Sequence, residues 1–375
     1  MITIDAFREG FSDDPGYLDF ASFGPMSRAV IDERTALGEI QARARYGAGA
    51  VFDEQDIRVR EAVRGITGFS TEQIVFQANA SIGLMHTMFG MSGQVLYSAR
   101  EYPSIPLSAQ RAGQSLGRLD AITLQAPGGL VTPAVVRDNL TPATTAVAVS
   151  LVDYRTGYLA DLEGIREVIG DRMLIVDAIQ GFGVVQAPYQ VADVVVAGGQ
   201  KWLRAGWGTG FLALSDRAAT ELVPLFSGVT GTIVPMGASY EEVPPPLQGA
   251  AAFQITRSDP IAQAGFATAL ERLAEVGVAE VNAAIAVTVS RIIDLADEFA
   301  LPVVSPRAET ERAGIVVLQP DSAQVTALTA SLINHGVTAT VRDGAVRLSA
   351  HVSTSEETLE ILRGAFTSFA SSAQY

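Results

Sequence analysis

The sequence predicts an α/β protein with a mostly parallel sheet between helices, followed by a smaller α+β domain. From residue 73 to residue 215, short runs of β-branched residues alternate with helical stretches, the rhythm of βαβ units. Runs such as TAVAVSLV at 145 are apolar almost throughout, as expected where helices cover both faces of a sheet. The 375 residues, 48% of them hydrophobic, suffice for a large core and a second, smaller one.

The elements of the large domain can be placed in order. After an N-terminal arm over 1–15, the stretches 28–47 and 53–68 have apolar residues every three and four positions and predict helices. Six strands then begin near residues 73, 94, 145, 173, 193 and 210. Ligands of such sheets bind beyond the carboxyl ends of the strands, so we expect the functional site there.

The C-terminal part predicts a compact domain with a hairpin. The segment EEVPPPLQG, at 241–249, reads as a linker, which places the large domain at 16–250 and the small domain at 251–375. A long helical stretch over 260–299 precedes the apolar run GIVVLQ and a helix near 323–335. The hairpin TATVRDGAVRLSA and a last helix from 354 complete the domain.

Charge and composition exclude several classes of protein. The formal charge of −15 repels nucleic acid and anionic lipid, so neither is expected as a partner. No apolar run reaches the roughly 18 residues of a membrane span, and the first residues do not resemble a signal peptide, which predicts a cytoplasmic protein. Without cysteine, the chain has no disulfide, no thiolate nucleophile and no Cys/His zinc cluster, and we expect no metal.

One lysine stands out among the basic residues. Of the 26 Lys and Arg residues, 25 are arginine and only Lys201 is lysine. A general replacement of lysine by arginine explains the 25 arginines, because surface positions tolerate either cation. It does not explain why Lys201 remains a lysine. A lysine amine can lose its proton when buried and attack a carbonyl, whereas arginine stays charged, so Lys201 is predicted to be an indispensable amine.

The segment 174–210 surrounds this lysine with further polar residues. Asp177 ends a buried strand, Gln180 follows in the next turn, and Lys201 comes after a second strand, so all three should meet at the ligand edge of the sheet. The segment resembles the class V aminotransferase family of fold-type I pyridoxal-phosphate enzymes, to which cysteine desulfurase, kynureninase and isopenicillin N epimerase are related. The resemblance covers most of the chain, from YLDFASFGP at 17 to the C-terminal helix.

The resemblance implies the fold-type I transferase fold, with seven strands in the large sheet, and pyridoxal 5′-phosphate as cofactor. Lys201 would hold the cofactor as an imine, and Asp177 would keep its pyridine nitrogen protonated. Gln180 would lie near the phenolic oxygen. Gln200 stands where relatives often carry histidine. Taken alone, Asp177 would be read as the cap of a turn, as aspartates at strand ends often are, but its position 24 residues before the only lysine favours the cofactor role.

The resemblance also assigns the cofactor's phosphate and ring. The turn ANAS, which ends a strand and begins a helix, would bind phosphate through Asn79, Ala80 and Ser81. An ordinary helix N-cap would have the same sequence. Ala80 and Gly198 depart from the family pattern, in which hydroxyl residues are common at these positions. Tyr102 would lie flat over the cofactor ring.

Three further residues complete the implied site. Arg347, in the stretch VRLSAH, would bind the substrate carboxylate by a two-pronged bond. Tyr154 lies in LVDYRTG, a segment similar to one that faces the cofactor in kynureninase, where Asp153 and Arg155 are also candidates. Thr256 would reach the phosphate of a partner subunit, which implies a homodimer with shared active sites. His351 is expected to serve in a turn or interface.

Several reactions remain open from the sequence. The resemblance favours an aminotransferase that acts on a small-molecule amino acid. A lyase, either kynureninase-like or acting on a carbon–sulfur bond, and an epimerase would share the first proton transfer. Absence of cysteine argues against a desulfurase that passes sulfur through a protein persulfide. A cofactor-binding protein without turnover is a further alternative, because of the missing phosphate hydroxyls.

Overall fold

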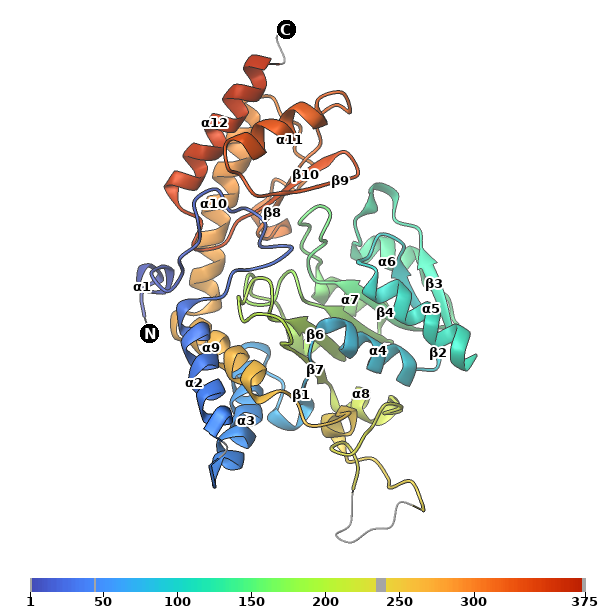
Figure 1. Ribbon diagram of the computed structural model, residues 1–375. Helices are drawn as coiled ribbons and strands as arrows, with labels where there is room; N and C mark the ends of the chain where they lie inside the picture. The colour runs from blue at the N-terminus through green and yellow to red at the C-terminus, as the bar shows by residue number, and fades with distance from the viewer. Residues whose placement is uncertain (1, 44, 234–240, 373–375) are drawn as a thin grey trace.

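The computed structural model describes residues 2–43, 45–233 and 241–372 (Figure 1). Its large sheet has seven strands in the order β1-β7-β6-β5-β4-β2-β3. The strands are β1 (Ile74–Phe76), β2 (Gly93–Ser98), β3 (Leu119–Leu124), β4 (Thr144–Ser150), β5 (Met173–Asp177), β6 (Val194–Gly198) and β7 (Gly210–Leu214). All run parallel except β7, which is antiparallel to both neighbours. The predicted α/β class with a mostly parallel seven-stranded sheet is confirmed.

Strand β3 was not among the strands predicted from apolar runs. It lies at the edge of the sheet, where it pairs with β2, and its residues are partly exposed. Because water covers much of its surface, the sequence LDAITL has no continuous apolar run to reveal it.

Helices cover both faces of the large sheet. Alternate residues of β4 belong to two separate core clusters, Val147 and Val149 to one and Ala146 and Ala148 to the other. The first face is packed by α3 (Ala48–Thr67), α7 (Leu162–Ile169) and α9 (Pro260–Val276), and the second by α4 (Ala80–Gly90), α5 (Ser104–Leu116) and α8 (Asp216–Glu221). Two further helices of this part are α2 (Arg28–Arg43), which packs on α9, and α6 (Pro133–Asn139).

The smaller sheet is antiparallel and lies above the large one in Figure 1. Its strands are β8 (Ile315–Leu318), β9 (Thr340–Arg342) and β10 (Ala345–Ser349), in the order β8-β10-β9. Strands β9 and β10 form the predicted hairpin, whose two turn residues Asp343 and Gly344 both have positive φ, the geometry that Asp-Gly favours. Around this sheet lie α10 (Val278–Glu298), α11 (Val325–Asn334) and α12 (Glu356–Ser372).

The long helical stretch predicted over 260–299 is two helices. They bend by 83° at Gly277, between α9 and α10. Helix α9 packs against α2 and α3, whereas α10 reaches the small sheet. The predicted boundary at residue 250 stays a prediction.

Among the described residues, no single helix is long and apolar enough to cross a membrane, although the bent pair α9 and α10 would pass by length and composition. The remaining helices are short. They are α1 (Ile4–Arg8) and the 3₁₀ turns Thr71–Gln73, Pro127–Gly129, Tyr189–Val191, Gly249–Phe253 and Glu309–Glu311.

The segment 17–24 links the small sheet to the loop that carries Lys201. The amide of Ser349 donates to the carbonyl of Leu18 at 2.7 Å, and the amide of Gly24 donates to the carbonyl of Gln200 at 2.9 Å. A Cβ on Gly24 would come within 2.0 Å of the Lys201 carbonyl oxygen, so only glycine fits here. The N-terminal segment therefore helps to fix the lysine loop.

Candidate active site

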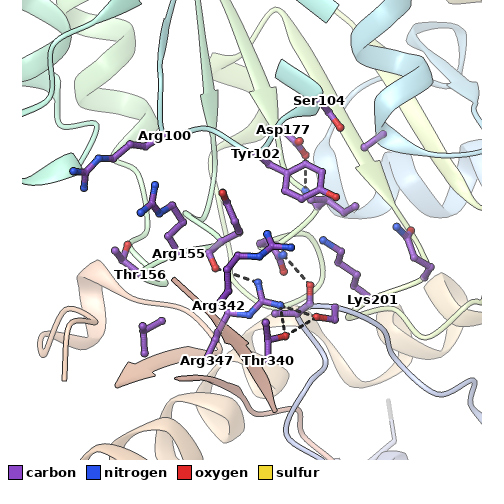
Figure 2. Close-up of a pocket in the computed structure, with 18 of the residues that line it drawn as sticks. Arg100, Tyr102, Ser104, Arg155, Thr156, Asp177, Lys201, Thr340, Arg342 and Arg347 are labelled. Atoms are coloured by element: carbon purple, nitrogen blue, oxygen red, sulfur yellow. Dashed lines mark hydrogen bonds between the residues drawn. The ribbon is translucent and has the colours of Figure 1, made fainter. Parts of the chain in front are cut away.

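A cavity of about 930 Å³ lies at the carboxyl ends of the strands and extends to the small sheet. It collects the residues that the sequence predicts, from segments far apart in the chain (Figure 2). These are Asn79, Ala80, Ser81, Tyr102, Tyr154, Asp177, Gln180, Gln200, Lys201 and Arg347.

Thr256 is the exception. It is exposed and lines a neighbouring depression of about 290 Å³, which shares Ala78 and Gly208 with the main cavity. Its role toward a partner subunit, and the homodimer itself, remain predictions.

Lys201 is buried in the loop after β6, with 7% of its surface exposed. The loop is held by backbone hydrogen bonds, among them one from the Arg204 amide to the Lys201 carbonyl at 3.1 Å. Burial lowers the pKa of the Lys201 amine to about 8, although nearby Asp177 raises it again, and Arg347 adds to the lowering. About a tenth of this amine is therefore unprotonated and nucleophilic at pH 7, far more than for a lysine with the ordinary pKa of 10.5.

Asp177 ends β5 and is 2% exposed. Its Oδ1 accepts a hydrogen bond from the amide of Ile179 at 3.1 Å. Burial raises the pKa of Asp177, while this hydrogen bond and Lys201 lower it. A buried carboxylate of this kind would be stabilised by a cationic ligand, such as a protonated pyridine nitrogen.

Gln180 is fixed at both ends of its amide. Its Nε2 donates to the Ala21 carbonyl at 3.0 Å, and its Oε1 accepts from the indole of Trp202 at 2.8 Å. The second proton of Nε2 is left for a ligand. By contrast, the Oε1 of Gln200 is buried without a partner, a condition that a bound ligand would relieve.

The start of α4, which the sequence predicts to bind phosphate, lines the cavity. The side-chain oxygen of Asn79 accepts a hydrogen bond from the amide of Ile82 at 3.0 Å, so Asn79 is the N-cap of α4. The first amides of the helix therefore point toward the cavity. The hydroxyl of Ser81 hydrogen-bonds to that of Ser104, at the start of α5, at 2.7 Å. Ser104 was missed by the sequence reasoning, and it supplies the second hydroxyl that Ala80 lacks.

Gly198 lies beside the side chain of Gln200. A Cβ at position 198 would lie 2.5 Å from the Oε1 of Gln200, which is the flexible end of that side chain. The two departures from the family pattern, Gly198 and Gln200, are therefore neighbours in the structure.

Tyr102 lies across the cavity from the lysine. Its ring centroid is 5.3 Å from the Nζ of Lys201, and its ring meets that of Tyr154 edge to face at 5.4 Å. With 40% of its surface exposed, the Tyr102 ring has a free side on which a flat aromatic ligand could stack.

Arg347 projects from β10 toward the same space. Its Nη2 donates to the hydroxyls of Ser22 at 2.7 Å and Thr340 at 3.0 Å, and its Nη1 donates to the carbonyl of Tyr154 at 3.2 Å. The carboxylate of Asp19 is 3.7 Å away. Burial lowers the pKa of Arg347, and its Nε is buried without a partner. The guanidinium is therefore oriented by three neutral oxygens and by an ion pair with Asp19, and its unpartnered Nε keeps capacity for an anion.

The further candidate Asp153 does not line the cavity, and neither does His351, which the sequence analysis expects in a turn or interface. Asp153 turns back on its own loop, where it accepts from the amide of Arg155 at 2.7 Å and the hydroxyl of Thr156 at 3.1 Å. His351 is buried against Phe20 and hydrogen-bonds with Ser353 at 2.9 Å. Asp153 therefore supports a turn, and His351 belongs to the packing between segments.

These residues fit pyridoxal phosphate. An amine, a carboxylate, an aromatic face and a helix start with two hydroxyls line one cavity, together with an unpaired buried amide oxygen. The family model described as "Aminotransferase class-V" matches residues 17–369. The chain belongs to this family. Pyridoxal phosphate is accordingly its cofactor.

Solved structures of the class V fold resemble the chain over almost its full length. The apo structure of cysteine desulfurase from Thermococcus onnurineus NA1 has a TM-score of 0.86 at 20% identity, with 97% of each chain covered. The cystine C–S lyase C-DES, in complex with cysteine persulfide, has a TM-score of 0.84 at 20% identity, covering 94% of this chain and 97% of the other. At these identities the likeness shows the fold. No curated protein matches the sequence significantly.

Proposed function

We propose that this class V enzyme is an aminotransferase that acts on an amino acid through Lys201. The observation that carries the proposal is the placement of the only lysine. It is buried, its pKa is lowered to about 8, and it lies in one cavity with Asp177, Tyr102 and Arg347. A single amine so placed can bind an aldehyde cofactor and then move a proton at the substrate's α-carbon.

Each residue has a distinct task. The cofactor supplies an aldehyde that condenses with amines and a ring that withdraws electrons from the α-carbon. Asp177 would keep the pyridine nitrogen of that ring protonated, Tyr102 would stack on the ring, and the start of α4 would bind the phosphate. Arg347 would hold the α-carboxylate of the amino acid, and the amine of Lys201 would take the α-proton.

A lyase is the second candidate, and the structural neighbours favour it. C-DES is a cystine C–S lyase whose complex contains cysteine persulfide, and other neighbours are cysteine desulfurases. Removal of the α-proton by Lys201 would be shared, but a substituent on the β-carbon would then leave. A persulfide relay on the protein itself is excluded because the chain has no cysteine.

The products distinguish the two reactions. The holoenzyme is mixed with single amino acids, while cofactor absorbance, oxo acid and ammonia are followed. Transamination predicts conversion to the pyridoxamine form with one equivalent of the matching oxo acid and no ammonia. Release of ammonia with pyruvate would instead establish the lyase.

Lys201→Ala and Lys201→Arg test the role of the amine. Both variants should lose the absorbance of the lysine-bound cofactor and nearly all turnover, by at least about 10²- to 10⁴-fold. Lys201→Arg is the matched control, since it keeps the positive charge but cannot form the bond. Turnover retained by either variant would refute the assignment.

A further inference from the structure

The cavity contains more arginines than the proposed reaction uses. Besides Arg347, its lining includes Arg100, Arg155 and Arg342. Most arginines of the described chain pair with an aspartate or glutamate, as Arg166 does with Asp193 at 2.6 Å. Among the described residues, Arg100, Arg155 and Arg342 form no ion pair, and all three are exposed. Three unpaired cations therefore line one space.

This concentration of charge runs against the charge of the whole protein. The formal charge of the chain is −15, but the cavity lining carries four arginines and Lys201 against two carboxylates, Asp177 and Asp343. In the proposed function, the start of α4 binds the phosphate of the cofactor, and Arg347 binds one carboxylate of the substrate. The remaining arginines attract a further anion.

Strand geometry places Arg342 beside Arg347. Thr340 pairs with Arg347 across the hairpin, and Arg342 pairs with Ala345. Residues two apart on a strand point to the same face, so these four side chains share a face, and all four line the cavity. Diagonal neighbours of this kind are roughly 7–8 Å apart. A molecule whose two anionic groups are separated by a few bonds can span Arg342 and Arg347.

Arg155 approaches from the other side of the cavity. It follows Tyr154, whose carbonyl accepts from Arg347, and its amide is fixed by Asp153. Figure 2 shows Arg155 and Arg100 on the side of the cavity away from Lys201. An anion near Arg342 and Arg155 would thus lie at the far end of a substrate whose α-carbon is near the lysine.

We infer that the amino acid substrate carries a second anionic group, a carboxylate or a phosphate, bound by Arg342 and Arg155. The inference rests on the proposed function, and it names the substrate class of the same site. Two guanidinium groups can each form a two-pronged bond with such an anion, and a neutral amide of the same shape would lose these charge-assisted bonds.

The test compares acidic amino acids with neutral counterparts, which are the amides of the same shape for glutamate and aspartate and serine, without the phosphate, for O-phosphoserine. We expect the holoenzyme to have a kcat/KM for glutamate, aspartate or O-phosphoserine about 10- to 100-fold above that for glutamine, asparagine or serine, respectively. The preferred pair identifies the anion, because O-phosphoserine presents phosphate and the other two present carboxylate.

Two variants locate the subsite. Arg342→Gln and Arg155→Gln should each lower kcat/KM for the preferred acid by about tenfold or more and leave the neutral counterpart within about threefold. Arg111→Gln is the matched control, since Arg111 is exposed on α5, outside the cavity, and should change neither value. Equal kcat/KM for each acidic and neutral pair, or equal losses on both in Arg342→Gln and Arg155→Gln, would overturn the inference and leave the aminotransferase assignment intact.

A binding measurement separates this inference from the function on which it rests. If the holoenzyme produces no oxo acid from any amino acid, that result counts against the aminotransferase assignment. Succinate and butyrate, which cannot react, are then titrated into the holoenzyme while the cofactor absorbance is followed. Tighter binding of succinate that is lost in Arg342→Gln would support the anionic subsite, and equal binding would overturn it.

Discussion

The two sides of the cavity are built in different ways. On the side of Lys201, the polar groups are buried and tied to other segments: Gln180 to Ala21 and Trp202, and the Gln200 carbonyl to Gly24. On the side of β9 and the loop after β4, Arg342 and Arg155 are exposed and have no ionic partner among the described residues. The fold thus fixes the groups proposed to face the cofactor, and it leaves the groups proposed to face the far end of the substrate to side chains that can change without cost to the core.

The largest expected effect is on stability, and it concerns a buried ion pair of the loop that carries Lys201. Arg204, fully buried, pairs with Asp13 of the N-terminal arm and lies 4.1 Å from the centre of the Phe11 ring. Arg204→Met would leave the Asp13 carboxylate, whose side chain is 9% exposed, without an ionic partner and with the Ser353 hydroxyl as its remaining side-chain donor, so we expect the free energy of unfolding to fall by about 3–5 kcal/mol. Denaturant unfolding followed by tryptophan fluorescence measures the loss.

The double variant Arg204→Met with Asp13→Asn provides the control. It removes both charges, and part of the stability should return because no uncompensated carboxylate remains. A loss under about 1 kcal/mol in the single variant would show that this side of the cavity is less constrained than its contacts indicate.

The next effect concerns the protonation of Lys201. Because burial lowers its pKa to about 8, the rate at which the apoprotein captures pyridoxal phosphate should rise about tenfold per pH unit below pH 8 and level off above it. Only the unprotonated amine attacks the aldehyde, which sets this sign. Stopped-flow absorbance of cofactor uptake gives the midpoint.

Asp177→Asn sharpens the measurement. The charge of Asp177 raises the pKa of Lys201, so its removal should move the midpoint to lower pH. A midpoint near the ordinary lysine value of 10.5 in the wild-type protein would contradict the buried environment of the amine.

The sequence predicted the lysine side better than the arginine side for physical reasons. Strands such as β5 and β6 are buried on both faces, so their apolar runs are visible, and Asp177 and Lys201 follow such strands at the ligand edge. Together with the lone lysine, this placement led to residues that line one cavity in the structure.

The groups that the sequence did not reveal meet only through the tertiary fold. Ser22 and Thr340 are 318 residues apart, yet their hydroxyls lie 2.9 Å from each other and both receive hydrogen bonds from Arg347. Neither has a local signal. For Arg342 a signal existed, because the Asp-Gly turn fixes the hairpin register and places Arg342 on the face of Arg347.

The smallest expected effect concerns the stability of the arginine side. The side chain of Arg342 forms no hydrogen bond or ion pair among the described residues, and it is exposed on β9. Arg342→Met should therefore change the free energy of unfolding by no more than about 0.5 kcal/mol, in contrast to the same exchange at Arg204. The two variants remove the same charge and differ only in surroundings, so denaturant unfolding under identical conditions measures the difference between the two sides directly. A loss of unfolding free energy in Arg342→Met comparable to that in Arg204→Met would mean that Arg342 supports the fold. The arginine side of the cavity could then not change without a cost in stability.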